Sequence, residues 1–286
     1  MIEVKTLEGV TLPELHRAWC NAFSDYTEPM DMSLQQLQHM IERRGYNPAL
    51  SFGAYHNDEL AGFTLNGTGI WNGKQIAYDT GTGIVKEFRQ QGIATRIFNE
   101  SVPVLKSHGI SQYLLEVIRN NTKAFDLYKK MGFEVTREFD YYVSPIEKLC
   151  TGKRQVDAAF EVKEMGNPDW DLLKTFRDFI PAWQNSIDAI NRKREHFKIL
   201  GLYRDNELAG YGIIEPATGD IPQLAIAPSY RRKGLATMLF HKLVPYAGIP
   251  KIKIINADAS CIPFRKFAES LGFVPGYGQY EMMLDL

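Results

Sequence analysis

A short turn sequence that occurs twice constrains the fold of this chain most. Residues 89–95 are RQQGIAT and residues 231–237 are RRKGLAT, so both follow the spacing Arg-x-x-Gly-x-Ala-Thr. A proline follows each glycine at the same distance, Pro103 in the first copy and Pro245 in the second. Because proline inside a helix removes a hydrogen bond, we expect two helices interrupted at equivalent points. The repetition predicts a duplicated domain.

The residues around the first turn predict a strand before it and a helix after it. Residues 78–85 are rich in aromatic, β-branched and glycine residues, while Ile93, Ile97 and Phe98 form an apolar helical face. Gly92 lets the backbone approach a ligand closely, and the first helical turn carries unpaired NH groups and the positive end of the helix dipole. Such a turn can bind phosphate, although most strand-turn-helix junctions need glycine only for steric reasons.

The composition is that of a globular protein with an almost neutral charge. The 286 residues are 44% hydrophobic and 23% charged, and the length suits two domains of moderate size. Thirty-three basic and thirty-four acidic residues give a net charge of −1, so no overall field attracts nucleic acid or an anionic membrane. We therefore expect neither as a partner, and a homodimer stays open.

The cysteines and the amino terminus indicate a cellular compartment. Cys20, Cys150 and Cys261 are widely spaced and share no ligand pattern with neighbouring histidines, which argues against a disulfide framework and a metal site. The first residues carry charges and no uninterrupted apolar core, and no stretch approaches the roughly 18 apolar residues of a spanning helix. These features predict a metal-free protein of the reducing cytoplasm.

Both halves are predicted to follow one order of elements. In the first half we expect a strand at 2–6, helices at 12–23 and 33–43, strands at 50–55, 59–66 and 76–85, the helix after Gly92, a strand at 113–118, a helix at 122–131, and one or two strands over 133–143. The second half repeats this order with a strand at 160–163, a helix at 170–179 and strands at 200–203, 207–214 and 222–227. The sequence ELAG at 59–62 recurs at 207–210. We predict domains at 1–145 and 158–286, joined by a charged linker over 145–158.

Two motifs together resemble the GNAT acyl-CoA-dependent N-acetyltransferases, and specifically their tandem-repeat members. The first motif is the Arg-x-x-Gly-x-Ala turn of Arg89, Gly92 and Ala94. The second is residues 121–133, NTKAFDLYKKMGF, which is similar to the family's Asn-x-x-Ala-x-x-Leu-Tyr and Gly-Phe signature. The resemblance covers nearly the whole chain and implies an α/β fold of two tandem GNAT-like domains. In each, helices would flank a mixed sheet that is splayed beside the strand preceding the turn.

The resemblance implies acetyl-CoA as cosubstrate and no metal. The pantetheine arm would enter the gap in the sheet and meet the backbone of Ile84 and Val85, where separated strands leave backbone groups unpaired. Asn121 would also bond the cosubstrate, a role compatible with capping a helix. The pyrophosphate would lie on the glycine turn, at Arg89, Gln91, Gly92, Ile93, Ala94 and Thr95.

The implied reaction is direct attack of a primary amine on the thioester in a ternary complex, which mainly requires orientation. Tyr128 matches the family's tyrosine near the sulfur, and a phenol with a pKa of ~10 stays protonated and can donate to the departing thiolate. The alternative for Tyr128 is packing on the sheet. Asp79 and Glu116 flank the gap and are the candidate bases, although each can instead be a solvated or salt-bridged strand residue. A water relay would need no dedicated base.

The second half lacks counterparts of two predicted site residues. Counted back from the Gly-Phe pair, Cys261 and Ala268 stand where the first half has Asn121 and Tyr128, and Phe267 carries no proton to donate. A less favoured alternative is that Tyr277 or Tyr280, in the last strand region, replaces the missing general acid. We therefore expect the second domain either to bind acetyl-CoA without turnover or to be structural.

The acceptor is expected to be the amine of a small molecule or a peptide. Its site would be built from the first helices, their loop and the terminal strands, which include Trp19, Asp25, Tyr26, Glu28 and Tyr141. Acidic residues beside aromatic ones favour a cationic amine. The rival functions are a non-catalytic acyl-CoA sensor and an interaction protein on a decayed fold, but Asn121 and Tyr128 favour the enzyme.

Overall fold

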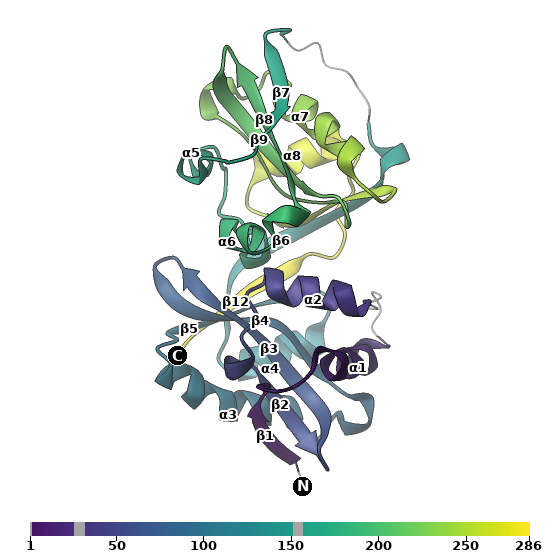
Figure 1. Ribbon diagram of the computed structural model, residues 1–286, viewed down its shortest axis with the longest axis vertical. Helices are drawn as coiled ribbons and strands as arrows, with labels where there is room; N and C mark the ends of the chain where they lie inside the picture. The colour runs from purple at the N-terminus through teal and green to yellow at the C-terminus, as the bar shows by residue number, and fades with distance from the viewer. Residues whose placement is uncertain (1, 26–31, 151–156) are drawn as a thin grey trace. The chain divides into compact units, whose positions relative to one another are not determined.

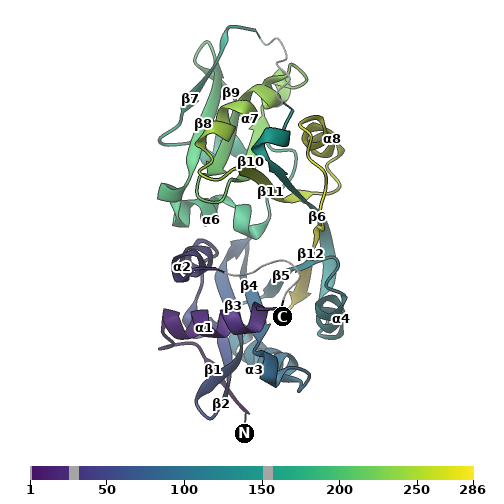
Figure 2. The ribbon, with the colours of Figure 1, turned by 90° about the vertical axis from the view of Figure 1, so that its right-hand side faces the viewer.

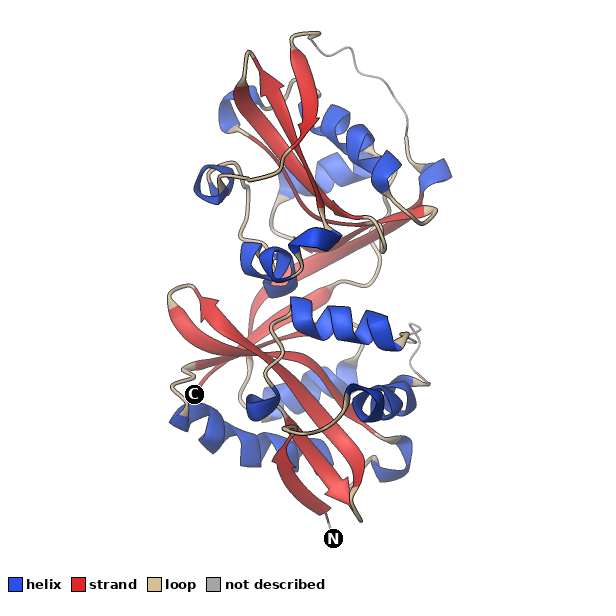
Figure 3. Ribbon diagram, viewed as in Figure 1, coloured by secondary structure: helices blue, strands red, loops and turns tan. Residues whose placement is uncertain are grey.

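The computed structural model describes residues 2–25, 32–150 and 157–286, which form two compact units (Figure 1). The first unit comprises Met1–Val117, Asn121–Thr136 and Glu281–Leu286. The second comprises Ile118–Asn120 and Arg137–Tyr280. Each unit contains a mixed sheet flanked by helices (Figure 3), as the sequence predicts.

These units differ from the predicted domains at the end of each half. Residues 137–145 group with the second unit and residues 281–286 with the first. Strand β6 (Glu134–Pro145) is consequently divided: Thr136 Oγ1 donates to Glu281 Oε1 at 2.7 Å in the first unit, whereas residues 139–145 pair with β11 (Lys251–Asp258) in the second. A strand-like sequence does not specify which sheet the strand joins, because that choice depends on distant partners.

The predicted linker is partly packed. Leu149 is buried in the core of the second unit, and the amide of Cys150 donates to the carbonyl of Leu271 at 2.9 Å. Residues 151–156 lie outside the described residues. The ordered part of the predicted linker therefore belongs to the second unit.

The first unit is built on strands in the order β1-β2-β3-β4-β5-β12-β6. Strands β1 to β4 are antiparallel neighbours, whereas β4 and β5 run parallel. The turn between β3 and β4 uses Asn72 and Gly73, both with positive φ. The strand bounds are β1 Ile2–Thr6, β2 Phe52–His56, β3 Glu59–Trp71, β4 Lys74–Ile84, β5 Gln112–Ile118 and β12 Gln279–Asp285.

Two pairs of helices cover opposite faces of this sheet (Figure 2). Helices α1 (Leu12–Phe23) and α2 (Leu34–Arg43) each begin with a capping box, and Trp19 and Leu37 pack in one core with Phe63 of β3. Helices α3 (Ile93–Ser107) and α4 (Thr122–Lys130) lie on the other face, where Phe98 stacks on Tyr113.

The second unit has the strand order β6-β11-β10-β9-β8-β7. The predicted helix at 170–179 is wrong in its length, because α5 (Trp170–Lys174) ends before Phe176, whose carbonyl accepts a hydrogen bond from Arg231 at 2.8 Å. The other bounds are β7 Phe160–Glu164, α6 Ile187–Arg192, β8 Lys198–Arg204, β9 Glu207–Glu215, β10 Asp220–Ile226, α7 Leu235–Leu243 and α8 Ile262–Ser270.

The repeated ELAG sequence has one structural reason in both units. An added Cβ on Gly62 would lie 2.6 Å from the side chain of Ile84, and one on Gly210 would lie 2.6 Å from that of Ile226. Glycine therefore leaves room for the isoleucine of the next strand. The predicted equal interruption by proline is wrong, since α3 continues through Pro103 while α7 ends before Pro245.

Candidate active site

The site lies where β4 and β5 of the first unit separate. These strands are paired only from Ile76–Asp79 to Gln112–Leu115, so the described ladder between them ends at Asp79. A bulge interrupts the pairing of β4 with β3 next to Asp79. Ile84 and Val85 lie on the separated part of the chain, which is the splayed geometry that the sequence predicts.

The glycine turn follows directly and presents the start of α3. Gln90 and Gly92 both have positive φ, 61° and 74°, and the first bond of α3 runs from the amide of Arg96 to the carbonyl of Gly92. The amides of Ile93, Ala94 and Thr95 precede that bond and cannot pair within the helix. No heavy atom lies within 4 Å of a Cβ built on Gly92, so the turn has an open surface. The side chain of Gln91 turns back to the carbonyl of Glu87 at 3.2 Å.

Arg89 fixes the turn to the end of α1. Its guanidinium donates to the carbonyls of Ile84 and Ala22 at 3.2 and 2.8 Å, and it forms a bidentate ion pair with Asp25 at 2.7 and 2.9 Å. The arginine of the motif is therefore held by the protein itself. This pair also lowers the pKa of Asp25 to about 2, through hydrogen bonds from Arg89.

Tyr128 and Asp79 meet in a cleft of about 320 Å³, open mouth included, between the sheet and helices α3 and α4. Tyr128 Oη donates to Asp79 Oδ2 at 3.1 Å, and Thr82 Oγ1 donates to the same oxygen at 2.8 Å. The cleft is lined by Thr64, Asp79, Thr82, Ala94, Phe98, Ser101, Tyr113, Leu127, Tyr128, Met131 and Phe133.

Burial governs the protonation of this pair. It raises the pKa of Asp79 to about 6, against the hydrogen bonds from Thr82 and Tyr128, which lower it. Burial also raises the pKa of Tyr128 well above its ordinary value, and the neighbouring Asp79 charge acts in the same direction. At neutral pH the phenol is therefore protonated, while the carboxyl titrates close to neutrality.

Glu116 lies on the other face of the sheet from Asp79. Asp79 is level with Leu115 in the parallel register, and side chains alternate along a strand, so Glu116 points away from the cleft. Its Oε2 accepts a hydrogen bond from Tyr78 Oη at 3.0 Å. The two predicted candidate bases are thus separated, and only Asp79 contacts Tyr128.

Asn121 caps α4, since its Oδ1 accepts a hydrogen bond from the amide of Ala124 at 3.2 Å. Sequence reasoning missed Thr82 and Thr64, whose hydroxyls lie 2.9 Å apart behind Asp79. Their positions opposite each other on β3 and β4 follow only from the register of the two strands. Small hydroxyl side chains beside glycine in residues 80–83 are the one signal that could have indicated them.

The residues predicted for the acceptor site do not come together among the described residues. Trp19 is buried in the core against Phe23, and Asp25 pairs with Arg89. Tyr26 and Glu28 lie outside the described residues, and Tyr141 belongs to the second unit.

The second unit repeats the gap and the turn. Here β10 and β11 are paired only at Asp220 and Lys253, and Gly234 has a φ of 79°. Arg231 donates to the carbonyl of Ile226 at 2.9 Å and pairs with Asp178 at 2.7 Å, as Arg89 does with Ile84 and Asp25. Ala268, at the position of Tyr128, is fully buried.

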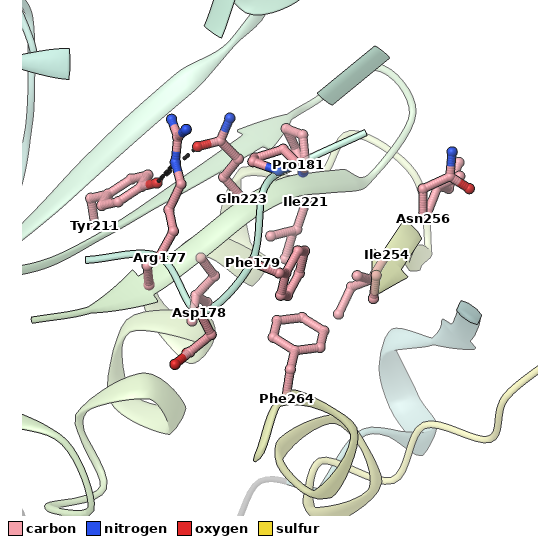
Figure 4. A pocket seen from close by; sticks show the side chains of 15 residues that line it. Arg177, Asp178, Phe179, Pro181, Tyr211, Ile221, Gln223, Ile254, Asn256 and Phe264 are labelled. Atoms are coloured by element: carbon pink, nitrogen blue, oxygen red, sulfur yellow. Dashed lines mark hydrogen bonds between the residues drawn. The ribbon is translucent and has the colours of Figure 1, made fainter. Parts of the chain in front are cut away.

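A chain of side-chain hydrogen bonds crosses the gap of the second unit, and Figure 4 shows its first links, from Arg177 through Tyr211 to Gln223. Arg177 Nε donates to Tyr211 Oη at 3.0 Å, and that hydroxyl donates to Gln223 Oε1 at 2.8 Å. Gln223 Nε2 donates to the carbonyl of Asn185 at 2.6 Å, and Asn185 Nδ2 donates to the carbonyl of Ile255 at 2.7 Å. The protein therefore links β10 to β11 by its own side chains.

The parts of the chain that the structure describes contain no group of three or more histidine, cysteine or acidic side chains that could hold a metal ion. None of their helices is both long and apolar enough to span a membrane.

Curated proteins resemble parts of this chain. Fission yeast (Schizosaccharomyces pombe) N-alpha-acetyltransferase 30 is 33% identical over 99 residues, which are 34% of this chain and 66% of that protein. Mycothiol acetyltransferase of Thermobifida fusca is 25% identical over 142 residues, 47% of this chain and 44% of that protein. The matched stretches thus span less than two thirds of these relatives.

Solved structures resemble the chain along its whole length. A tandem GNAT protein from the clavulanic acid biosynthesis pathway superimposes with a TM-score of 0.73 at 14% identity, covering 100% of this chain and 98% of that one. A GCN5-related N-acetyltransferase from Sphaerobacter thermophilus gives 0.75 at 11% identity, covering 99% and 95%. The pattern of the Acetyltransferase (GNAT) family matches residues 12–133 and 163–273. The chain therefore belongs to the GNAT acetyltransferase family, with one such domain in each half.

Proposed function

We propose that the first unit is an acetyl-CoA-dependent N-acetyltransferase that acts on a primary amine by direct attack in a ternary complex. The observation that carries this proposal is the protonated phenol of Tyr128 in the cleft where β4 and β5 separate. Relatives named N-alpha-acetyltransferase 30 and thialysine N-epsilon-acetyltransferase (mouse, 32% identical over 74 residues) support nitrogen as the acceptor atom.

The first unit offers acetyl-CoA two complementary surfaces. The amides of Ile93, Ala94 and Thr95 point out of the start of α3, beside an open Gly92, where a pyrophosphate would accept their hydrogen bonds. The separated backbone at Ile84 and Val85 suits the amides of a pantetheine arm. The cosubstrate supplies an activated acyl group and a thiolate as leaving group.

The chain's own residues would then move two protons. Tyr128 would donate its phenolic proton to the departing sulfur. Of the two candidate bases, Asp79 accepts a hydrogen bond from Tyr128. Glu116 lies on the opposite face of the sheet and accepts a hydrogen bond from Tyr78. We assign the base to Glu116, acting directly or through water, because an acid and a base that serve opposite sides of one reacting carbon need separate positions.

The acceptor remains a class, the primary amine of a small molecule or a peptide. A homodimer, the absence of nucleic-acid and membrane partners, and the cytoplasmic location stay predictions.

The test is an assay of the purified full chain with acetyl-CoA and a panel of small-molecule amines and peptides. We expect release of free thiol that depends on one class of amine, together with an acetylated product detected by mass spectrometry. Acetyl-CoA that raises the melting temperature without transfer to any amine would identify a sensor instead. No shift in melting temperature would identify an interaction protein.

A further inference from the structure

We infer that Asp79 is the proton partner of Tyr128: in the reacting complex the protonated Asp79 carboxyl donates to the phenol oxygen, so that Tyr128 can donate its own proton to the leaving sulfur. The inference rests on the proposed function, and it gives Asp79 a different task from the amine base expected from the sequence.

The contact between the two groups and the single proton of the phenol carry the argument. In the structure Tyr128 Oη donates to Asp79 Oδ2 at 3.1 Å. A phenol has a single proton, so a Tyr128 hydroxyl that points at the carboxylate does not point at a sulfur. Its oxygen can still accept. If Asp79 carries a proton, the bond reverses, and the phenolic proton becomes available to the leaving group.

The surroundings of Asp79 favour a carboxyl that changes charge. The residue is 8% exposed, and the side-chain hydrogen bonds from Thr82 and Tyr128 both go to its Oδ2. An ionised carboxylate is costly in such a buried place, and protonation removes that cost. Thr82 donates to Oδ2, and its hydroxyl lies 2.9 Å from that of Thr64, so this oxygen is held inside the cleft.

The other groups that face Asp79 shift its pKa less than burial does. Arg44, which follows α2, favours the ionised form by its charge, while Tyr113 on β5 and Tyr78 on β4 are protonated at neutral pH. Helix α3 and strand β3 contribute only side chains that do not titrate, Ala94, Phe98, Ser101 and Thr64. Burial therefore dominates, and the carboxyl can gain or lose a proton near neutrality.

The proton balance of the step closes without a further reactant. The carbon–sulfur bond breaks and its electron pair goes to sulfur, which takes the proton of Tyr128. Tyr128 takes the proton of Asp79, which is left as a carboxylate. The amine nitrogen loses one proton when the amide forms, and that proton, passed through the base and solvent, restores Asp79.

The inference predicts an alkaline limb in the pH profile of turnover. Protonated Asp79 is required, so turnover is present below the pKa of Asp79 in the complex and is lost as pH rises through it. Removing the Thr82 hydroxyl destabilises the ionised carboxyl, so Thr82→Val should move this limb to higher pH. Deprotonation of the amine gives an opposite limb, but that limb is the same for every variant with one acceptor.

The experiment compares wild type, Thr82→Val, Asp79→Asn and a control, Ser101→Ala, whose hydroxyl lines the same cleft but bonds to the carbonyl of Phe98. The pH profile of kcat is measured with an acceptor from the amine panel. The Asp79 carboxyl is titrated separately by carbon-13 NMR, which requires no activity. Circular dichroism confirms that each variant is folded.

We expect Thr82→Val to raise both the NMR pKa of Asp79 and the alkaline limb by roughly one pH unit, the size of one hydrogen bond to a charged group. Ser101→Ala should move neither. Asp79→Asn should lose the alkaline limb and roughly 10²-fold in kcat, since its amide can donate a hydrogen bond but no proton.

An alkaline limb that is unchanged in Thr82→Val or retained in Asp79→Asn overturns this inference and leaves the proposed function standing, because wild type still transfers acetyl. A wild type that acetylates no amine overturns the proposed function and the inference together. The two failures are therefore distinguishable.

Discussion

The gap between β4 and β5 in the first unit and the gap between β10 and β11 in the second have the same framework and different contents. In both, the parallel pairing ends early, and a glycine with positive φ begins the next helix. The first gap contains Asp79 and Tyr128 beside an open turn. The second is crossed by the side chains of Gln223 and Asn185, as Figure 4 shows for Gln223 and its neighbours.

The difference shows how separated strands can be satisfied in two ways. Parting two strands leaves backbone carbonyls and amides that need partners. In the second unit the chain supplies one itself, because Asn185 Nδ2 donates to the carbonyl of Ile255. In the first unit we expect acetyl-CoA to supply them. The buried Ala268 in place of the phenol argues that turnover belongs to the first unit.

The feature that both units keep is structural. Arg89 and Arg231 each donate to the carbonyl of the isoleucine before the turn. Each also pairs with an aspartate that follows the first helix of its unit, Asp25 after α1 or Asp178 after α5. The arginine of the repeated motif therefore holds the turn in place. Recurrence of the motif establishes a repeated fold, while the chemistry depends on a few other positions.

The largest expected effect comes from blocking each glycine turn in its own unit. Gly92→Trp should abolish measurable acetyl-CoA binding by calorimetry, because the indole would cover the amides of Ile93 to Thr95. Gly234→Trp is the matched control, since its φ of 79° imposes the same backbone strain as the 74° of Gly92. It should keep most of the turnover. Equal loss of turnover in two folded variants would contradict the asymmetry.

The next effect concerns the phenols of the two gaps. Tyr128→Phe should lower kcat by roughly 10² to 10⁴, because a general acid is removed while the ring packing against Phe133 is kept. Acetyl-CoA affinity and melting temperature should stay nearly unchanged. Tyr211→Phe removes the corresponding kind of group from the second gap and should leave kcat unaltered. Normal turnover in Tyr128→Phe would make that residue a packing aromatic.

A smaller effect is expected on stability from the side chain that crosses the second gap. Asn185→Ala leaves the carbonyl of Ile255 without its donor and should reduce the free energy of unfolding by about 1–3 kcal/mol, measured by urea denaturation. The kcat of the first unit should not change. Unaltered stability would mean that water replaces the amide at no cost, and the hydrogen-bonded link across the second gap would have no energetic basis.

The features of the two units that could be predicted from the sequence are those set by residues close together in the chain. Helices α1 and α2 and the strand-turn-helix junctions at Gly92 and Gly234 are set by residues close in sequence, and their predictions are confirmed. The splayed sheet came from the family resemblance and is also confirmed. These features need no knowledge of distant strands.

The failures are non-local. Neither the division of β6 between the units nor the opposite facing of Asp79 and Glu116 can be obtained without the register of paired strands. Thr82 was missed for the same reason, since a bulge in β4 turns it toward Asp79. Residues 175–179 were predicted as part of a helix, because the hydrogen bond from Arg231 to the carbonyl of Phe176 is long-range and leaves no local pattern.

The smallest expected effect tests the anchor that both units share, through the pH dependence of stability. Arg89 lowers the pKa of Asp25 to about 2, below the ~3.9 of an unfolded chain. A depressed folded pKa contributes stability above the unfolded value, and that contribution is lost as pH falls from about 4 toward 2. In Asp25→Asn the free energy of unfolding should therefore fall less steeply between about pH 4 and pH 2 than in wild type. At pH 7 it should be slightly lower than in wild type. Because the pair is partly exposed, salt should weaken the effect.

The matched control is Asp58→Asn, in the exposed turn between β2 and β3, and acid unfolding followed by circular dichroism is the measurement. If Asp25→Asn and Asp58→Asn unfold identically, the ion pair contributes nothing measurable, and Arg89 holds the turn through the carbonyls of Ile84 and Ala22 alone.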